Sequence, residues 1–147
     1  MSKSTTLTAF PDANVWLALS SRDHQHFSIA WNWYQALPGQ VTLSFCRFTQ
    51  LGYLRLLTTR SVMGLGTLNQ EAAWAAYDRW IADADAQLLE EPMHLESTFR
   101  LLAGSEQVSP KDWADSYLIA FAESAGLTLV TFDQALAGKA KGAVLLQ

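Results

Sequence analysis

SPKDWADSYLIAFAESAGLTLVTFD, residues 109–133, is the stretch from which the fold of this chain can be inferred. It opens with a helix-start signal, in which Ser109 can cap, Pro110 suits the first helical position and Asp112 adds an acid to the first turn. Apolar residues then recur at helical spacing until Gly126, which predicts the end of the helix. The apolar, β-branched run after this glycine predicts a buried strand.

Two carboxylates in this stretch occupy unusual positions. Asp115 lies one turn into the helix, on the side expected to face the sheet, and Asp133 follows the strand predicted over residues 127–131. Asp12 takes the same place after a strand predicted over residues 7–10. Such folds bind ligands at the carboxyl edge of a parallel sheet, so we expect all three acids to reach one pocket. The alternative for Asp12 alone is a helix N-cap.

Strand and helix patterns alternate along the chain. Strands are predicted at residues 7–10, 41–45, 87–89, 127–131 and 143–146, helices at 15–19, 27–37, 47–58, 68–81, 94–103, 110–125 and 134–137, and loops at 61–67 and 138–142. This order predicts an α/β fold: a three-layer sandwich with a central parallel sheet of about four or five strands and helices on both faces. We expect a single domain over residues 1–147.

The helix expected over residues 47–58 carries a glycine. Phe48, Leu51 and Leu54 are expected to face inward. Gly52 inside a helix costs up to about 1 kcal/mol relative to Ala, which suggests that another element approaches closely there.

Composition restricts the class of protein. Half of the 147 residues are hydrophobic and 16% are charged, which excludes a disordered chain. The net charge of -4 argues against a generally basic nucleic-acid binder but leaves room for a local basic groove. The single Cys46 suggests a reducing compartment. Residues 1–6 lack the apolar core of a signal peptide and no run is long enough to span a membrane, so we expect a cytoplasmic protein.

Two histidines stand in the polar turn over residues 21–26. His24 and His26 are two residues apart, so they would not face one another on a helix. We expect them in a loop or first turn, with a surface or capping role favoured over a metal role, because no familiar ligand spacing surrounds them.

The cluster of acids, if it converges, needs a counter-charge. Two charges 4 Å apart at an effective dielectric of about 20 repel by roughly 4 kcal/mol. Either the pKa values rise or a divalent cation binds. Carboxylate oxygens with few histidines suit Mg²⁺ or Mn²⁺, which can activate water for attack on a phosphodiester.

Five segments carry a resemblance to a known family: residues 10–19, 23–26, 49–57, 115–122 and 129–133. In these segments the sequence resembles PIN-domain ribonucleases, specifically the VapC-type toxins of toxin–antitoxin pairs, and the resemblance covers nearly the whole chain. It implies a compact α/β fold with a central parallel sheet. It also implies Mg²⁺- or Mn²⁺-dependent cleavage of RNA, single-stranded or structured such as transfer RNA, by the toxin of a type II pair. A cognate antitoxin would block the site, and a homodimer is implied.

The resemblance also assigns the acids. The first, third and fourth acids of the family match Asp12, Asp115 and Asp133, which would be catalytic and metal-binding. The second acid, usually a Glu that opens the helix after the second strand, is Gln50 here. Asp112, one turn before Asp115, could supply the missing carboxylate or could simply cap the helix.

Polar and basic residues complete the expected site. Asn14 and Thr49, together with Gln50, would orient ligands or substrate. The candidates for holding the RNA backbone, each of which could instead be a solvated charge, are Arg47, Arg55, Lys111, Lys139 and Lys141.

Three other functions remain open. The uncharged Gln50 keeps a catalytically inactive PIN-like module, which binds RNA or an antitoxin, as the main alternative. A structure-specific DNA nuclease is disfavoured by the short chain. A phosphatase with an aspartyl nucleophile would have a second Asp at the position of Asn14.

Overall fold

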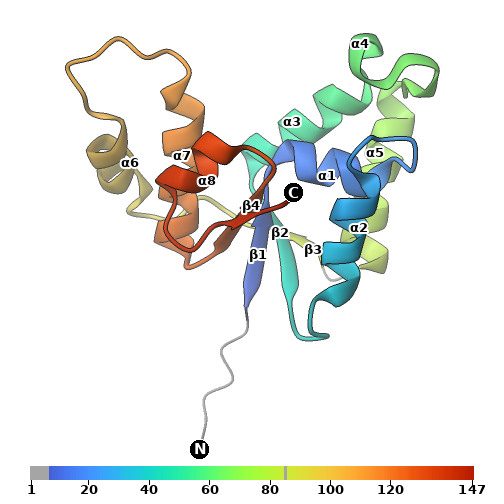
Figure 1. Ribbon diagram of the computed structural model, residues 1–147, viewed down its shortest axis with the longest axis horizontal. Helices are drawn as coiled ribbons and strands as arrows, with labels where there is room; N and C mark the ends of the chain where they lie inside the picture. Colours follow the sequence, from blue (N-terminus) through green and yellow to red (C-terminus); the bar gives the residue numbers. More distant parts are fainter. Residues whose placement is uncertain (1–6, 85) are drawn as a thin grey trace, which may run out of the picture.

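The computed structural model describes residues 7–84 and 86–147, so the prediction about a signal peptide, which rests on residues 1–6, lies outside the described residues. The described strands are all parallel and form one sheet (Figure 1). They are β1 (Thr8–Pro11), β2 (Thr42–Phe45), β3 (Ala86–Leu88), β4 (Thr128–Thr131) and β5 (Val144–Leu145), in the spatial order β3-β2-β1-β4-β5. The predicted central parallel sheet is confirmed.

Helices cover both faces of this sheet (Figure 1). On one side lie α1 (Ala13–Ser20), α2 (Phe27–Ala36), α3 (Arg47–Leu57), α4 (Arg60–Met63), the 3₁₀ turn η1 (Gly64–Gly66) and α5 (Gln70–Asp83). On the other side lie α6 (Leu95–Ala103), α7 (Asp112–Ala125) and α8 (Gln134–Lys139). The three layers expected from the sequence are therefore present.

The two faces of the sheet follow from the alternation of side chains along each strand. In β1, Ala9 packs with the α1–α5 side and Phe10 with the α6–α8 side. In β4 the order is reversed, since Leu129 packs with α7 and Val130 with α1 and its neighbours. Both faces are buried, which explains why these strands are continuous apolar runs rather than alternating ones.

The strand order changes direction beside β1. The chain builds outward from β1 to β2 and β3, and then β4 is added on the other side of β1. Ligands of open α/β folds bind outside the carboxyl ends of the strands at such a switch point. The topology therefore predicts a binding site at the residues that follow β1 and β4.

Gly52 lies where α3 crosses α1. A Cβ at this position would stand 3.0 Å from the Cβ of Ala13, so glycine allows the close approach without displacing Ala13. The close contact expected from the sequence is confirmed. It brings the beginning of α1 against the first turns of α3.

Several local predictions were wrong. Residues 60–66 form α4 and η1 instead of a loop, because Thr59 accepts backbone bonds from Val62 and Met63 and so starts a helical turn. Phe48 and Leu51 are 44% and 59% exposed. α3 instead buries the face that carries Tyr53, the residue after Gly52, because this face packs on α1.

The key helix begins later than predicted. Ser109 donates its hydroxyl to the Asp112 carboxylate at 2.6 Å instead of capping backbone N–H groups, and α7 starts at Asp112. Its end is as predicted, with Gly126 in the left-handed region at φ 69°. Lys139 was also misplaced, since it is the last residue of α8 and not part of a loop.

None of the helices in the described ranges combines the length and the apolar character that a bilayer crossing needs.

Candidate active site

Two of the predicted acids begin helices at the carboxyl edge of the sheet. Asp12 follows β1 and accepts the backbone N–H of Val15 at 3.1 Å, and Asp133 follows β4 and accepts that of Leu136 at 3.1 Å. Because β1 and β4 are neighbours, the two carboxylates lie at adjacent strand ends. Asp12 is therefore an N-cap, as the simpler interpretation held, and it also lies at the switch point.

A buried threonine connects these two acids. Thr131, the last residue of β4, donates its hydroxyl to Asp12 Oδ2 and accepts the backbone N–H of Asp133 at 2.9 Å. The Thr131 side chain is fully buried. Thr131 was not predicted as a site residue, because threonine is common in strands for packing reasons.

Asp12 is the most deeply buried of the acids, with 8% of its surface exposed. Burial raises the pKa of its carboxyl, and the negative charge of Asp133 acts in the same direction. Hydrogen bonds from Thr131 and Val15 oppose the increase. The ionised form of Asp12 is thus disfavoured in the folded protein, and a cation placed beside it would favour ionisation.

The third acid comes from α7 and already has a cationic neighbour. Lys139 Nζ lies 3.5 Å from Asp115 Oδ2 and 3.1 Å from Asp112 Oδ1. The hydrogen bond from Ser109, together with Lys139, lowers the pKa of Asp112, and Asp112 in turn raises the pKa of Lys139. A single ammonium therefore balances two carboxylates at the beginning of α7.

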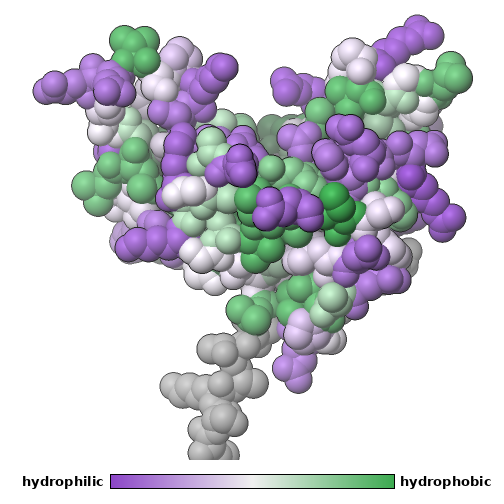
Figure 2. Space-filling view, in the orientation of Figure 1, coloured by the Kyte–Doolittle hydropathy of each residue, from purple (hydrophilic) through white to green (hydrophobic). Residues whose placement is uncertain are grey.

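A cavity of about 520 Å³ brings most of the predicted site together. Figure 2 shows a hollow between the two lobes at the top of the view. The lining side chains that matter here are Asp12, Asn14, His24, His26, Phe48, Thr49, Asp115, Phe132 and Asp133. The three acids come from three separate segments, and all three line this one cavity.

Not every predicted residue reaches this cavity. Gln50 is 3% exposed, does not line the cavity, and accepts Arg47 Nη1 at 2.6 Å. Thr49 does line it, while its hydroxyl bonds with both backbone groups of Cys46 and so closes the first turn of α3. Asp112 lies outside the cavity lining.

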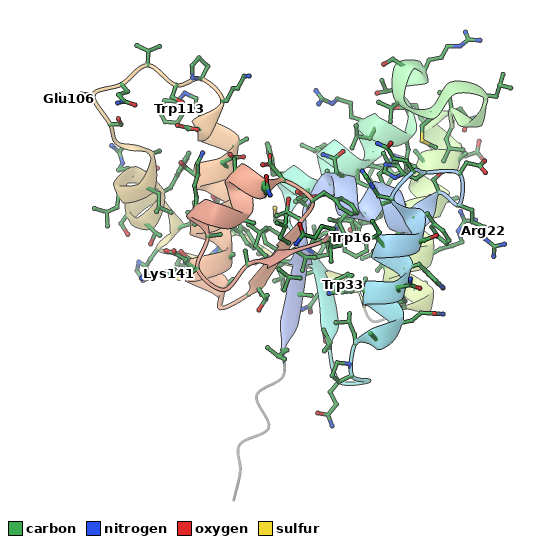
Figure 3. The ribbon with its side chains drawn as sticks, in the orientation of Figure 1. Trp16, Arg22, Trp33, Glu106, Trp113 and Lys141 are labelled. Atoms are coloured by element: carbon green, nitrogen blue, oxygen red, sulfur yellow. The ribbon has the colours of Figure 1, made fainter. Side chains whose placement is uncertain are left out.

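The predicted RNA-contacting cations occupy different places. Arg47 is engaged by Gln50 and Lys139 by the acids. Arg55 is exposed in the last turn of α3, Lys111 precedes α7, and Lys141 lies in the turn after α8 (Figure 3). Within the ranges 7–84 and 86–147, no ion pair involves these last three side chains.

The two histidines of the α1–α2 turn were predicted to have a surface or capping role, and a place in the cavity was not predicted for them. His24 and His26 both line the cavity, and His26 makes no side-chain capping bond although it precedes α2. The signal that could have identified them was their position in a turn close after the helix that Asp12 begins. Phe48 and Phe132 were missed as well, because aromatic residues usually belong to the core.

The donor atoms suit a hard divalent cation. Carboxylate oxygens of Asp12, Asp115 and Asp133 face one cavity, and the buried Asp12 lacks a cationic partner among the described residues. No group of three or more His, Cys, Asp or Glu is gathered closely enough to hold a metal, as far as the described chain shows. The residues thus fit Mg²⁺ or Mn²⁺ in kind, and Asp115 would first have to leave Lys139.

The chain is similar to known proteins over most of its length. The sequence model of the PIN domain matches residues 9–142. Ribonuclease VapC41 of Mycobacterium tuberculosis is 40% identical over 128 residues, which cover 84% of this chain and 88% of the relative. Ribonuclease VapC39 of the same organism is 32% identical over 151 residues, or 95% of this chain and 98% of the relative.

Among solved structures, VapBC2 from Rickettsia felis shares the fold. That structure is bound to a DNA fragment from the VapBC2 promoter. It superposes with a TM-score of 0.67 at 10% identity and covers 95% of this chain and 97% of that chain.

Proposed function

This chain belongs to the PIN-domain family, and on that premise we propose that it is an endoribonuclease that acts as the toxin of a type II toxin–antitoxin pair. The observation that carries the proposal is the convergence of Asp12, Asp115 and Asp133 on one cavity at the switch point of the sheet. The 40% identity to a ribonuclease over most of the chain supports the choice of RNA as substrate.

Asp12, Asp115 and Asp133 would together hold Mg²⁺ or Mn²⁺. When bound, the ion would lower the pKa of a water and stabilise the charge that develops on the phosphate. The bond from Thr131 fixes the direction of the Asp12 carboxylate, and the N-cap bond of Asp133 does the same for the acid beside it. Asn14 and Thr49 supply neutral polar groups to the cavity wall, where they can orient the substrate.

This chain would use three acids where the family pattern has four. Gln50 is directed to Arg47 and adds no charge to the cavity. Asp112 is engaged by Ser109 and Lys139, so we assign it a role in positioning Lys139 rather than in binding metal. Arg55, Lys111 and Lys141 remain the candidates for contacts with the RNA backbone.

A partner would control the activity. The structural likeness to VapBC2 supports a cognate antitoxin. Since Lys139 already shows that an ammonium can bind Asp115, a basic antitoxin side chain could occupy the acidic cavity in the same way. A homodimer in the cytoplasm, acting on single-stranded RNA or on structured RNA such as transfer RNA, completes the proposal.

The test is RNA cleavage by the purified chain, free of antitoxin, with Mg²⁺, with Mn²⁺ and with a chelator. Asp12→Asn should reduce cleavage by about 100-fold or more, the scale of losing one group that stabilises transition-state charge. Asp78→Asn, an exposed carboxylate on α5 outside the cavity, is the matched control and should cleave as the wild type does.

Two results would contradict the proposal. Cleavage that persists in chelator would argue against a metal. If the folded wild type cleaves single-stranded RNA and transfer RNA no more than the folded variants do, the inactive binding module is favoured.

A further inference from the structure

An aromatic wall stands beside the acids. The ring of His26 is stacked on that of Phe132, with centroids 4.9 Å apart and an angle of 30° between the planes. The ring of His24 follows, 5.7 Å from His26. Phe132 directly precedes Asp133, and all three rings line the same cavity as the carboxylates. The wall therefore joins the α1–α2 turn to the end of β4.

Packing leaves part of each ring uncovered, although Phe132 also packs against the core on the α1–α5 side. His24, His26 and Phe132 are all partly exposed, so each keeps part of its surface toward the cavity. The neighbouring Arg22 of the same turn is exposed and points away from the molecule (Figure 3). The turn thus directs its cationic side chain outward and its two imidazole rings inward.

The hydrogen bonding of His24 fixes its tautomer. Its Nδ1 accepts the backbone N–H of His26 at 3.0 Å, so a neutral ring carries its proton on Nε2. Burial, and then the proximity of His26, lower the pKa of His24 and favour this neutral ring. His24 therefore offers the cavity one N–H donor without a formal charge.

We propose that His24, His26 and Phe132 form a nucleobase subsite, in which the stacked pair holds an unpaired base next to the bond to be cut and His24 Nε2–H donates to an acceptor on that base. The proposal rests on the proposed ribonuclease function and specifies its substrate contacts. Unstacked bases of RNA are commonly bound on flat side chains of Phe, Tyr, Trp or His. A base on this wall would lie beside Asp133, which places its phosphate near the acids.

The size of the cavity agrees with one nucleotide. Its volume of about 520 Å³ falls within the usual range for sites that take small molecules. A duplex would keep its bases stacked inside, away from this wall. The subsite therefore favours a single-stranded segment, a loop or a bulge over a continuous duplex.

The experiment measures binding of short fluorescent RNAs in chelator, where cleavage is absent, and then cleavage with Mn²⁺. His26→Ala should weaken binding of the RNA roughly 5- to 150-fold, the range for one stacked base. His26→Phe should bind nearly as well as the wild type, whereas His26→Leu, which fills the space without a flat ring, should bind as weakly as His26→Ala. His94→Ala, an exposed histidine before α6, is the matched control.

A second readout separates stacking from structural damage. An RNA with one abasic position at the cleavage site should bind wild type and His26→Ala equally. In cleavage, His26→Ala should raise KM more than it lowers kcat. His24→Phe should keep binding but reduce discrimination among the four bases.

The outcomes are distinct for the two proposals. Wild-type binding and cleavage that His26→Ala and His26→Leu leave unchanged would overturn the subsite while the ribonuclease stands. RNA binding that depends on His26, without any metal-dependent cleavage, would support the subsite and count against the enzyme. Absence of RNA binding by the folded wild type would overturn the subsite.

Discussion

Lys139 is the residue whose role is easiest to test in isolation. Its ammonium lies against Asp115 and Asp112, so it competes with any cation for Asp115. Lys139→Met should tighten Mn²⁺ binding, by roughly fivefold or less, because exposed ion pairs are weak. Calorimetric titration with Mn²⁺ measures this. Lys141→Met is the control, and weaker binding by Lys139→Met would show that the lysine instead positions Asp115.

Asp12 makes the stability of the metal-free protein depend on pH. Its folded pKa is raised above the ordinary value of 3.8, chiefly by burial. Between these two values the folded state retains a proton that the unfolded state has released, so stability falls as pH rises through this window. In chelator, Asp12→Asn should therefore gain stability relative to wild type as the pH rises above 3.8.

Urea unfolding at several pH values gives the comparison. Asp78→Asn should follow the wild-type curve. If the free energy of unfolding differs between Asp12→Asn and wild type by the same amount at every pH, folding does not raise the pKa of Asp12.

At the residue scale, the sequence placed the acids better than their surroundings. Asp12 and Asp133 follow strands, and any two neighbouring parallel strands bring such residues together. The sequence did not predict the contacts of Thr131, Lys139 and the two histidines, because these contacts join segments far apart in the chain. Gln50 was placed in the site by resemblance alone, and its burial against Arg47 could not be read from the pattern.

At the scale of elements, replacing two helical glycines by alanine should change the stability of the protein differently. Gly138 in α8 has no atom within 4 Å of an added Cβ, so Gly138→Ala should stabilise the protein by about 0.5–1 kcal/mol. Gly52→Ala gains the same propensity but meets Ala13 at 3.0 Å, so it should gain less or lose stability. Chemical denaturation of both variants measures the difference, and equal stabilisation would show that α1 and α3 are not tightly packed.

The same contact explains which element predictions were wrong. Helical periodicity located α3 but indicated the wrong face as buried, because the apolar Phe48 and Leu51 are exposed while the polar Thr49 and Gln50 are buried. The choice depends on the close crossing with α1. Likewise Ser109 has the correct chemistry for a cap, but the Asp112 carboxylate engages its hydroxyl first.

At the scale of the whole molecule, the parallel sheet and the family were predictable, because the alternation of elements and the spaced motifs extend along the chain. The spatial order of the strands was not predicted. A pocket at the carboxyl edge of the sheet was also expected, but its full lining was not, since His24, His26 and Phe132 reach it from the α1–α2 turn and the end of β4.

Binding of a cation should stabilise the molecule as a whole. At a Mn²⁺ concentration about 100 times Kd, the gain is about 2.7 kcal/mol, which for a domain of this size raises Tm by roughly 5–10 °C. Thermal unfolding with and without Mn²⁺ tests this. Asp78→Asn should keep the shift, Asp12→Asn should lose most of it, and an equal shift in both would place the ion elsewhere.

The short helix α8 has a consequence that neither of its ends reveals alone. Asp133 caps this helix and Lys139 is its last residue, so the acid after β4 and the ammonium beside Asp115 belong to the same short helix. A movement that draws Asp133 toward an ion must also carry Lys139 relative to α7. In the proposed metal-bound state, drawing Asp133 toward the ion and freeing Asp115 from Lys139 would therefore be one coupled motion.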